Sequence, residues 1–301
     1  MEIINTCPVC SSDTFETYLI CTDHTVSKKE FTIVKCKSCG FKYTNPRPSE
    51  IELGGYYKSD EYISHSDIQK GLVNRLYHFV RKYTLIKKLQ LVARLTAAVM
   101  DNNSKNILDI GCGTGAFLDV CNKAGFNCLG IEPDPDARKI ALNKYGVKVM
   151  GEEELMNLPN ETFDLITLWH VLEHVPRLNE RIEKIKVLLK PMGRVIVAVP
   201  NCSSYDAKYY KHFWAAYDVP RHLYHFTPED ISRLFVKNGM KVEQCLPMRF
   251  DSFYVSMLSE KYKTGKSNFI KAIWIGFKSN FLAIRSGGKQ FSSQIYVISK
   301  S

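Results

Sequence analysis

A glycine-rich turn between an apolar strand and a helix constrains this chain more than any other feature. Residues 105–116 read Lys-Asn-Ile-Leu-Asp-Ile-Gly-Cys-Gly-Thr-Gly-Ala. The first half is a short apolar run of the kind that forms a buried parallel strand. Gly111, Gly113 and Gly115 follow, and residues 116–124 are typical of a helix. Glycine allows a sharp turn and a close approach of a ligand to the backbone, so the sequence predicts a ligand-binding loop at a sheet edge.

Two acidic residues indicate the kind of ligand. The loop also satisfies the dinucleotide fingerprint, Gly111-x-Gly113-x-x-Ala116, which leaves an NAD-dependent oxidoreductase as an alternative. Asp109, at the end of the strand, would repel a pyrophosphate but suits a ligand with a sulfonium and an ammonium group. Glu132 ends the next apolar run, where a carboxylate can accept hydrogen bonds from both ribose hydroxyls. Together the two carboxylates favour a cationic nucleoside over a dinucleotide.

Four motifs in a fixed order resemble a known family. They are Leu-Asp-Ile-Gly-Cys-Gly-Thr-Gly (108–115), Gly-Ile-Glu-Pro-Asp (130–134), Phe-Asp-Leu-Ile-Thr-Leu-Trp-His-Val-Leu-Glu-His-Val (163–175) and Leu-Leu-Lys-Pro-Met-Gly-Arg-Val-Ile-Val-Ala-Val-Pro-Asn (188–201). With these motifs the chain resembles class I S-adenosylmethionine-dependent methyltransferases over residues 105–245. The resemblance implies an α/β, Rossmann-like sheet that is mostly parallel and has an antiparallel last strand. It also implies S-adenosylmethionine as the cofactor.

The resemblance assigns roles to residues around the glycine loop. Glu132 is expected on the ribose, and the loop from Gly111 to Gly115 around the methionine portion. The adenine is expected beside residues 151–155, after the third strand. His170 directly follows the strand 163–168 and is expected to border the same site. The predicted cofactor-binding residues are Asp109, Gly111, Gly113, Gly115, Glu132, Glu153, Glu154, Leu155 and His170.

The first 45 residues contain two cysteine pairs, Cys7-Pro-Val-Cys10 and Cys36-Lys-Ser-Cys39. Each pair places two sulfur atoms on one tight turn, and two such turns form a closed tetrahedral thiolate site. Residues 14–21 and 31–34 have the pattern of short strands. The segment therefore predicts a zinc ribbon with a structural ion. Iron in the same cage is the alternative.

His170-Val-Leu-Glu-His174 matches the H-x-x-E-H pattern of inverted zinc peptidases. A peptidase needs both histidines on one helical face, whereas here His170 directly follows a strand, so we reject that interpretation. Similar O-methyltransferases of ubiquinone pathways have a Glu-His pair that helps to hold a divalent cation, with an acidic residue where this chain has His170. Alternatively, Glu173 and His174 only orient the loop.

Residues 200–227 hold the densest set of polar and aromatic side chains outside the cofactor motifs. In similar methyltransferases this segment, after the fifth strand, commonly binds the methyl acceptor. A histidine near its neutral pKa is a suitable base for a hydroxyl or an acidified carbon. The predicted catalytic residues are His174, His222 and His225. Some of the aromatic residues, such as Trp214 and Phe226, are expected to lie in the core instead.

Length and composition allow one large domain and a small one. The 301 residues are 45% apolar and 24% charged, as in globular proteins. The expected domains are a zinc ribbon at 1–45, a connector with an amphipathic helix at 46–100, and an S-adenosylmethionine-binding domain at 101–301. No run is long and apolar enough to span a bilayer. Ten cysteines without an export signal indicate reduced thiols or metal ligands in a cytoplasm.

The net charge of +10 is concentrated in the last third, where residues 201–301 carry 15 basic and 7 acidic residues. Within it, residues 261–289 contain seven basic residues and no acidic one, together with an apolar stripe at helical spacing. We expect a helix whose stripe packs on the core or covers the acceptor site. The alternative is peripheral contact of residues 261–289 with an anionic membrane.

The resemblance favours methyl transfer to a small molecule, sugar or glycolipid, on oxygen or carbon. A cysteine-rich start followed by this core is similar to methyltransferases of bacterial polysaccharide and sugar pathways, including sugar C-methyltransferases. RNA base methylation is the main alternative, because some such enzymes also carry an N-terminal zinc module. No Asn/Asp-Pro-Pro-aromatic motif for base flipping is present, so a nucleic-acid partner is not favoured. A non-catalytic binding module is disfavoured by the intact Asp109, glycines and Glu132.

Overall fold

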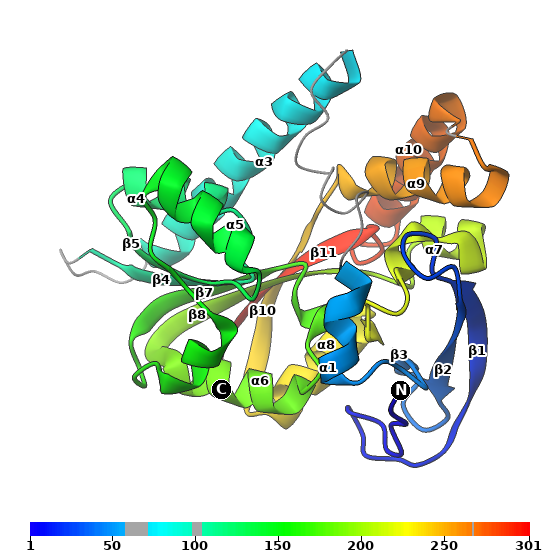
Figure 1. Ribbon diagram of the computed structural model, residues 1–301, viewed down its shortest axis with the longest axis horizontal. Coiled ribbons are helices and arrows are strands. Elements are labelled where there is room, and N and C mark those ends of the chain that lie inside the picture. Colours follow the sequence, from blue (N-terminus) through cyan, green and yellow to red (C-terminus); the bar gives the residue numbers. More distant parts are fainter. Residues whose placement is uncertain (58–71, 98–103, 267) are drawn as a thin grey trace.

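The computed structural model describes residues 1–57, 72–97, 104–266 and 268–301, with the backbone alone for residues 72–79. Its strands form two sheets, a large one of seven strands and a small one of four (Figure 1). The N-terminal segment forms most of the small sheet, and the rest of the chain forms the large sheet with its covering helices.

The large sheet has the strand order β10-β11-β8-β7-β4-β5-β6. Its strands are β4 (Asn106–Ile110), β5 (Asn127–Ile131), β6 (Val149–Met150), β7 (Phe163–Trp169), β8 (Leu189–Pro200), β10 (Met240–Pro247) and β11 (Ser293–Lys300). Strands β6, β5, β4, β7 and β8 run parallel, and β11 lies antiparallel between β8 and β10. This arrangement confirms the predicted α/β sheet and its antiparallel last strand.

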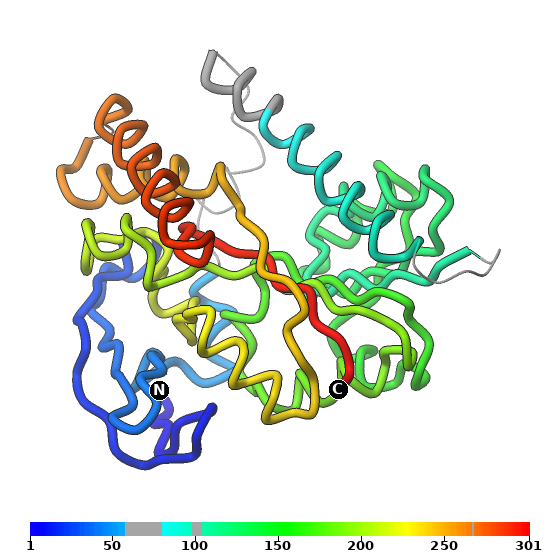
Figure 2. Tube along the Cα trace, turned by 180° about the vertical axis from the view of Figure 1, so that it is seen from behind, coloured from blue at the N-terminus to red at the C-terminus, as the bar shows by residue number. Residues whose placement is uncertain are grey.

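Helices cover both faces of the large sheet (Figures 1 and 2). They are α3 (Leu72–Thr96) and α4 (Ala116–Lys123) on one face, and α6 (Leu178–Leu188) and α8 (Pro228–Lys237) on the other. Successive side chains of a strand point to opposite faces. Ile107 of β4 accordingly packs in the cluster with α3 and α4, whereas its neighbour Leu108 packs in the cluster with α6 and α8. A continuous apolar strand is therefore required at this position.

Short elements connect these layers. They are α1 (Glu50–Leu53), the 3-10 turn η1 (Gly54–Tyr57), α5 (Pro135–Ile140), the π-helical turn η2 (Ala141–Tyr145), the 3-10 turns η3 (Glu152–Asn157) and η4 (Leu172–His174), α7 (Tyr205–Tyr210), η5 (Lys211–Phe213) and η6 (Ala215–Tyr217). α8 begins as its sequence predicts, because Thr227 and Asp230 form a reciprocal capping box around Pro228. The predicted connector 46–71 begins with α1 and η1, and residues 58–71 lie outside the described part.

The small sheet is built by two distant parts of the chain. Its order is β1 (Phe15–Thr22), β2 (Glu30–Cys36), β3 (Lys42–Thr44) and β9 (Tyr224–His225). The last pairing, of Lys42 with His225 and Tyr43 with Tyr224, joins the N-terminal ribbon to the segment rich in histidines. Phe41 stacks on Tyr224 with 6.0 Å between ring centroids. The ribbon therefore positions residues of the second half of the chain.

Two helices are inserted between β10 and β11. They are α9 (Asp251–Thr264), which the sequence did not predict, and α10 (Phe269–Arg285), which lies within the predicted helical segment. The expected helix before the last strand is present and packs on α9 and α7, but its apolar stripe is not the face that packs. Phe269, Trp274 and Phe277 are exposed, and the buried face of α10 consists mainly of small residues. Among the described residues, no helix is both long and apolar enough to cross a membrane.

Candidate active site

Asp109 lies near the carboxyl end of β4 and is 2% exposed. Its Oδ1 accepts a hydrogen bond from the Thr167 hydroxyl of the neighbouring strand β7 at 2.6 Å. Burial raises the pKa of Asp109 to about 7, although the hydroxyl of Thr167 and the ammonium of Lys88 favour the carboxylate. Asp109 is therefore a buried carboxyl group that a cationic ligand would stabilise in its ionised form.

Lys88 reaches this region from α3. Its ammonium lies 4.1 Å from the centroid of the Trp169 ring, at the end of β7. Burial lowers the pKa of Lys88 to about 8, while the nearby carboxylates of Asp109 and Asp251 oppose the shift. The sequence gives no sign of this role for Lys88, because nothing in the local pattern shows that β7 lies opposite α3.

The three glycines of the loop after β4 have different surroundings. All have positive φ values, +71° for Gly111, +55° for Gly113 and +79° for Gly115. A Cβ atom on Gly111 would lie 2.4 Å from Val171, and one on Gly115 would lie 2.7 Å from Val147. A Cβ atom on Gly113 would meet nothing within 4 Å. Two of the glycines thus satisfy packing, and Gly113 faces the open space that a ligand needs.

Glu132 follows β5 and is 9% exposed. Its Oε2 accepts from the Gly113 N–H at 2.8 Å and its Oε1 from the Asp134 N–H at 3.0 Å. Burial raises the pKa of Glu132, and these two amides oppose the shift. Each carboxylate oxygen has a second lone pair. Glu132 can therefore hold the glycine loop through the Gly113 N–H and still accept hydrogen bonds from ribose hydroxyls.

The predicted adenine segment forms η3. Leu155 is 1% exposed, and Glu153 is exposed. Glu154 is half-buried and accepts from the Asn157 side chain at 3.4 Å. Glu152, which the sequence did not single out, forms an ion pair with Arg181 of α6. The placement of an adenine here remains a prediction.

His170 follows β7 in a left-handed backbone conformation, with φ of +57°. This conformation is uncommon for a residue with a side chain, and such strained residues cluster at functional sites. Its Nε2 lies 3.1 Å from Asp251 Oδ2 of α9, and its Nδ1 lies 3.3 Å from Glu173 Oε1. Burial disfavours the imidazolium, but the two carboxylates outweigh it and raise the pKa of His170 to about 10. His170 is therefore a cation at neutral pH.

Glu173, His174 and His222 converge beside His170. Their potential ligand atoms all lie within 4.8 Å of one another. Glu173 is fully buried, and among the described residues neither of its oxygens has a hydrogen-bond partner of good geometry. Burial opposes its ionisation, but the surrounding imidazoles, first His170, lower the pKa of its carboxyl. The cluster is thus an anion enclosed by three histidines.

Hydrogen bonds orient the two imidazoles. His174 Nδ1 lies 3.1 Å from the Arg221 carbonyl oxygen and 2.9 Å from the Tyr57 hydroxyl. His222 Nδ1 lies 2.9 Å from the Ala216 carbonyl oxygen. Because a carbonyl oxygen only accepts, each Nδ1 carries the proton, and each Nε2 is the basic nitrogen. Burial, reinforced by the neighbouring His222, lowers the pKa of His174 to about 4, so His174 is neutral at pH 7.

Arg221 connects this cluster to the rest of the molecule. Its side chain is 2% exposed and pairs with Asp218 of the same loop and with Asp23 of the ribbon, the latter at 3.4 Å. It also donates to the Tyr56 carbonyl oxygen at 3.1 Å. Asp218 and Arg221 lie in the polar segment 200–227, but the sequence assigned neither of them a role.

His225 lies apart from these imidazoles in the small sheet. It is 3% exposed, and its Nε2 lies 3.1 Å from the Thr44 hydroxyl. Burial lowers the pKa of His225 well below its usual value. The role of His225 as a base stays a prediction. The burial of His225 makes it a weaker candidate for that role than His222.

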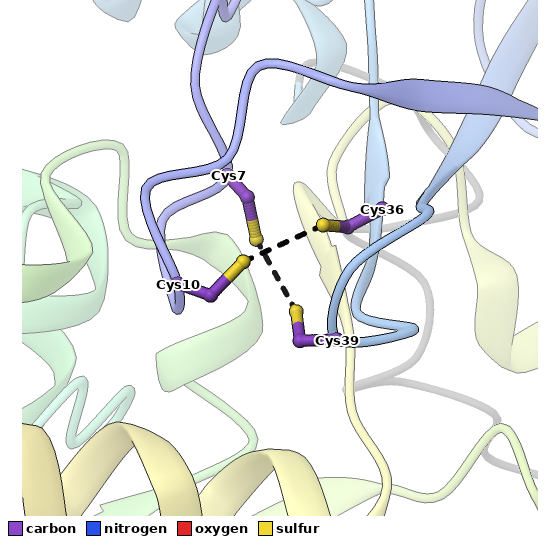
Figure 3. Close-up of side chains that lie close together, drawn as sticks. All are labelled: Cys7, Cys10, Cys36 and Cys39. Carbon is purple, nitrogen blue, oxygen red and sulfur yellow. Dashed lines mark hydrogen bonds between the residues drawn. The ribbon is translucent and has the colours of Figure 1, made fainter.

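The four N-terminal cysteines form a compact cluster (Figure 3). Cys7 Sγ lies 3.6 Å from Cys39 Sγ, and Cys10 Sγ lies 3.5 Å from Cys36 Sγ. Zinc bonded to four thiolates would separate neighbouring sulfur atoms by about 3.8 Å, so the cluster is compatible with a zinc ion. Burial opposes ionisation of Cys36, but hydrogen bonds led by the Cys39 N–H outweigh it and lower its pKa to about 7.

Around the histidine cluster, sequence reasoning missed Asp251 and Tyr57. Asp251 begins α9, which carries no motif and is far from His170 in the chain. Tyr57 ends η1, and only a weak clustering of glycine and tyrosine at 54–57 marked that segment. Tertiary contacts alone bring both to the histidine cluster.

Comparison with known families identifies the family to which the fold belongs. A family model described as a methyltransferase domain matches residues 78–245, more than half of the chain. The chain belongs to this methyltransferase family. The matched segment contains the glycine loop, Glu132 and the Glu173–His174 pair. S-adenosylmethionine is the cofactor of class I members of this family, as the resemblance implied.

Known relatives and solved structures agree with this assignment. The chain is 29% identical to a ubiquinone biosynthesis O-methyltransferase of Aeromonas salmonicida, over 54% of this chain and 72% of that protein. It is 28% identical to the mitochondrial enzyme of that name from Rattus norvegicus, over 49% of this chain but only 47% of the rat protein. The magnesium protoporphyrin IX methyltransferase of Synechocystis PCC 6803, solved with bound SAH, shares the fold. Its TM-score is 0.55 at 14% identity, covering 84% of this chain and 100% of that one.

The different surroundings of the glycines in this methyltransferase give a testable difference in stability. Gly111→Ala combines a left-handed backbone with the 2.4 Å clash against Val171, and should lower the free energy of unfolding by roughly 2–4 kcal/mol. Gly113→Ala carries only the backbone strain, roughly 1–2 kcal/mol. Urea unfolding of both variants measures the difference. Adding Val171→Ala should recover part of the free energy of unfolding that Gly111→Ala loses. Equal losses of that free energy in the two single glycine variants would contradict the packing role of Gly111.

Proposed function

We propose that this protein transfers the methyl group of S-adenosylmethionine to a small-molecule acceptor, with a sugar or glycolipid as the acceptor class. The observation that carries the proposal is the adjacency of two sites. A buried carboxyl group and an open glycine loop on β4 lie beside a cluster of histidines that follows β7. The chain spans less than half of the rat relative, so the acceptor class is proposed from the resemblance to methyltransferases of polysaccharide and sugar pathways.

The cofactor is proposed to lie along the carboxyl ends of β4 and β5. Glu132 would accept hydrogen bonds from the ribose hydroxyls, and the backbone at Gly113 would approach the methionine portion. Asp109 would face the positive charge of the cofactor. The remaining lone pairs of Glu132 and the free space above Gly113 support this placement. Asp109 is the residue that separates this cofactor from a pyrophosphate ligand.

Calorimetry with S-adenosylhomocysteine and NAD in parallel tests the cofactor. S-adenosylhomocysteine should bind and NAD should not. Glu132→Ala should weaken that binding about 10- to 100-fold, because one or two charge-assisted hydrogen bonds are lost. Asp119→Ala, which removes a partly buried carboxylate that pairs with the exposed Lys123 on α4, is the control and should bind normally. Unchanged affinity in Glu132→Ala, or tighter binding of NAD, would overturn the assignment.

Binding should also depend on pH through Asp109. Its folded-state pKa of about 7 lies above the ordinary value, so the carboxyl is partly protonated at neutral pH without ligand. A cationic ligand favours the carboxylate and releases that proton. Affinity should therefore rise with pH up to about 7 and then level off, changing at most about tenfold per pH unit below it. Calorimetry in buffers of different ionisation enthalpy measures the proton release, which Asp109→Asn should abolish.

Methyl transfer needs few groups from the protein, because the sulfonium is already a strong electrophile. The protein must align acceptor and methyl group, exclude water and accept a proton where the acceptor has one. We assign proton transfer to Nε2 of His222, with His174 neutral beside it and Glu173 stabilising the imidazolium that forms. His170, held as a cation between Glu173 and Asp251, is a positioning residue at the end of β7.

His222→Gln tests this assignment. It keeps the size of the side chain but removes the basic nitrogen, so turnover should fall roughly 10²- to 10⁴-fold on an acceptor found in a panel of nucleotide-linked sugars. Affinity for S-adenosylhomocysteine should stay unchanged. His24→Gln is the matched control, because it removes an imidazole of the N-terminal segment that stacks on Tyr262. Turnover should stay normal in this variant. Normal turnover in His222→Gln, or a parallel loss of cofactor affinity, would remove His222 from the chemistry.

A divalent cation is the second candidate role for the cluster. One carboxylate and two imidazoles suit a first-row transition metal better than Mg²⁺. Both buried oxygens of Glu173 lack a hydrogen bond of good geometry within the described part of the chain, which supports such a site. A bound cation would be held by Glu173, His174 and His222 and would polarise an acceptor hydroxyl. Turnover that is lost on adding a chelator and restored by one metal, with the zinc ribbon intact, would favour this role over general-base catalysis.

We also propose that Cys7, Cys10, Cys36 and Cys39 hold one structural zinc ion and that residues 1–45 form the zinc ribbon domain. The spacing of the sulfur atoms and the amide donors around Cys36 support it. All four positions of a tetrahedral ion would be filled by protein, so the ion would not take part in the reaction. Its role would be to hold β3 and Asp23 against the histidine segment.

Elemental analysis should find one zinc ion per chain and no iron. Cys36→Ser should lose that ion and make the first 45 residues sensitive to protease, because metal binding supplies much of the folding free energy of so small a unit. Cys245→Ser, at a half-buried thiol of β10, should change neither property. A chain without metal, or a Cys36→Ser variant as resistant as the parent, would contradict the zinc site.

The acceptor class rests on the resemblance of the cysteine-rich start and the core to methyltransferases of sugar pathways. RNA remains the alternative acceptor, and a labelling experiment distinguishes the two acceptor classes directly. Labelled S-adenosylmethionine incubated with the protein should label a nucleotide-linked sugar or glycolipid fraction, whereas label in purified RNA would favour RNA base methylation.

A further inference from the structure

Helix α10 is packed through its small residues. Its buried positions are Ala272, Ile275, Gly276, Ser279 and Ala283. A Cβ atom on Gly276 would lie 2.6 Å from the Phe253 ring of α9, so the two helices are in close contact. Ser279 donates a 2.6 Å hydrogen bond to the buried carboxylate of Asp206 on α7. These contacts fix which face of α10 points inward.

The opposite face is large, apolar and exposed. It consists of Phe269, Ile270, Ile273, Trp274, Phe277, Phe281 and Ile284, with exposures from 49% to 84%. We call these seven residues the α10 apolar face. Scattered exposed apolar residues are normal, but a contiguous patch of aromatic residues on a single helix marks a surface that binds something. Figures 1 and 2 show α9 and α10 side by side at the periphery of the molecule.

Positive charge accompanies this face. Lys271, Lys278 and Arg285 recur every seventh residue, about two helical turns apart, and so form a row along one flank of α10. Lys271 pairs with the buried Glu260 at 3.3 Å. Lys278 and Arg285 are exposed and lie over aromatic rings rather than carboxylates. Residues 261–289 contain no acidic residue, so the charge of the flank is available to an anionic partner.

We propose that the α10 apolar face lies in the headgroup region of an anionic lipid bilayer, with α10 parallel to the membrane surface. Trp274 and the three phenylalanines would enter the boundary between headgroups and acyl chains, and Lys278 and Arg285 would contact lipid phosphates. An exposed apolar stripe with a basic flank is the arrangement that binds such interfaces. The packing of α10 through small residues explains why its large ones remain outside.

A second copy of this chain fits the face less well. An isologous dimer places the same patch of both copies together, so Lys278 and Arg285 would lie beside their own counterparts with no acidic residue from 261–289 between them. Like charges at an interface oppose association. An anionic surface instead satisfies both the apolar face and its flank.

The membrane surface would lie close to the proposed site of methyl transfer. α9 packs on α10 through Phe253, and α9 begins at Asp251, which pairs with His170 at 3.1 Å. An acceptor in the membrane would thus reach the site along the helix pair. Lipid binding itself does not depend on the proposed function, because it can be measured without turnover.

Sedimentation of the full chain with vesicles tests the proposal. The protein should bind vesicles of equimolar phosphatidylcholine and phosphatidylglycerol at low salt, and bind phosphatidylcholine alone only weakly. Trp274→Ser with Phe277→Ser should lower the partition coefficient at least about tenfold. Lys278→Gln with Arg285→Gln should lower it about tenfold and make it less sensitive to salt. All four side chains are exposed, so the variants should keep their thermal stability.

Tryptophan fluorescence gives a local readout. Of the three tryptophans, Trp214 is buried, Trp169 is partly buried beneath Lys88, and Trp274 is 67% exposed. Vesicles should therefore shift the emission to the blue through Trp274, and Trp274→Ser should abolish the shift.

Matched controls separate this surface from general stickiness. Leu142→Ser with Met192→Ser removes two apolar residues of similar exposure, 63% and 68%, from other elements and should bind vesicles like the parent. Three outcomes would overturn the proposal. They are no binding to anionic vesicles at low salt, an equal loss in these controls, and sedimentation equilibrium showing that the α10 apolar face instead forms a dimer or binds another protein.

Discussion

The arrangement of the site depends on the ion pairs and hydrogen bonds of the buried Arg221 guanidinium. Its pair with Asp23 and its bond to the Tyr56 carbonyl oxygen join the N-terminal segment and η1 to the loop of Asp218 and Arg221. Its own carbonyl oxygen orients His174. Removing one partner of such a buried pair leaves an uncompensated charge and is strongly destabilising. The ribbon therefore positions the proposed catalytic histidines, although it contributes none of them.

The site also concentrates charged groups that water cannot easily reach. Asp109 and Glu173 are both buried, yet burial prevails only at Asp109, whose pKa is raised to about 7. At Glu173 the adjacent imidazoles prevail, and its pKa is lowered. The difference is physically reasonable, because Asp109 would gain its counter-charge from a bound ligand while Glu173 has its own in His170. One carboxyl group is thus suited to ligand binding, and the other to holding histidines.

Helix α10 shows a different use of packing. Its small residues make the close contact with α9 and α7. Asp206 of α7 anchors the helix by accepting a hydrogen bond from Ser279. The same carboxylate accepts hydrogen bonds from Ser292 and Trp214, which lie outside α10. Small residues allow close packing of helices, so the large residues are left on the outer face. From the sequence alone, the natural expectation was the reverse, with large apolar residues inward. The hydrophobic stripe of a helix identifies the face that avoids water, but not the partner that removes it from water.

The sequence by itself determined the elements whose signals are local. The strand, glycine loop and helix around residues 105–116, the carboxylate Glu132, the paired cysteines and the capping box at Thr227 follow from short-range sterics and hydrogen bonding. The tertiary structure alone decided which distant residues meet. Asp251 and Tyr57 reach the histidines, β9 completes the ribbon sheet, and α10 turns its aromatic face outward. These outcomes depend on the free energy of packing between segments far apart in the chain, and no local pattern encodes that quantity.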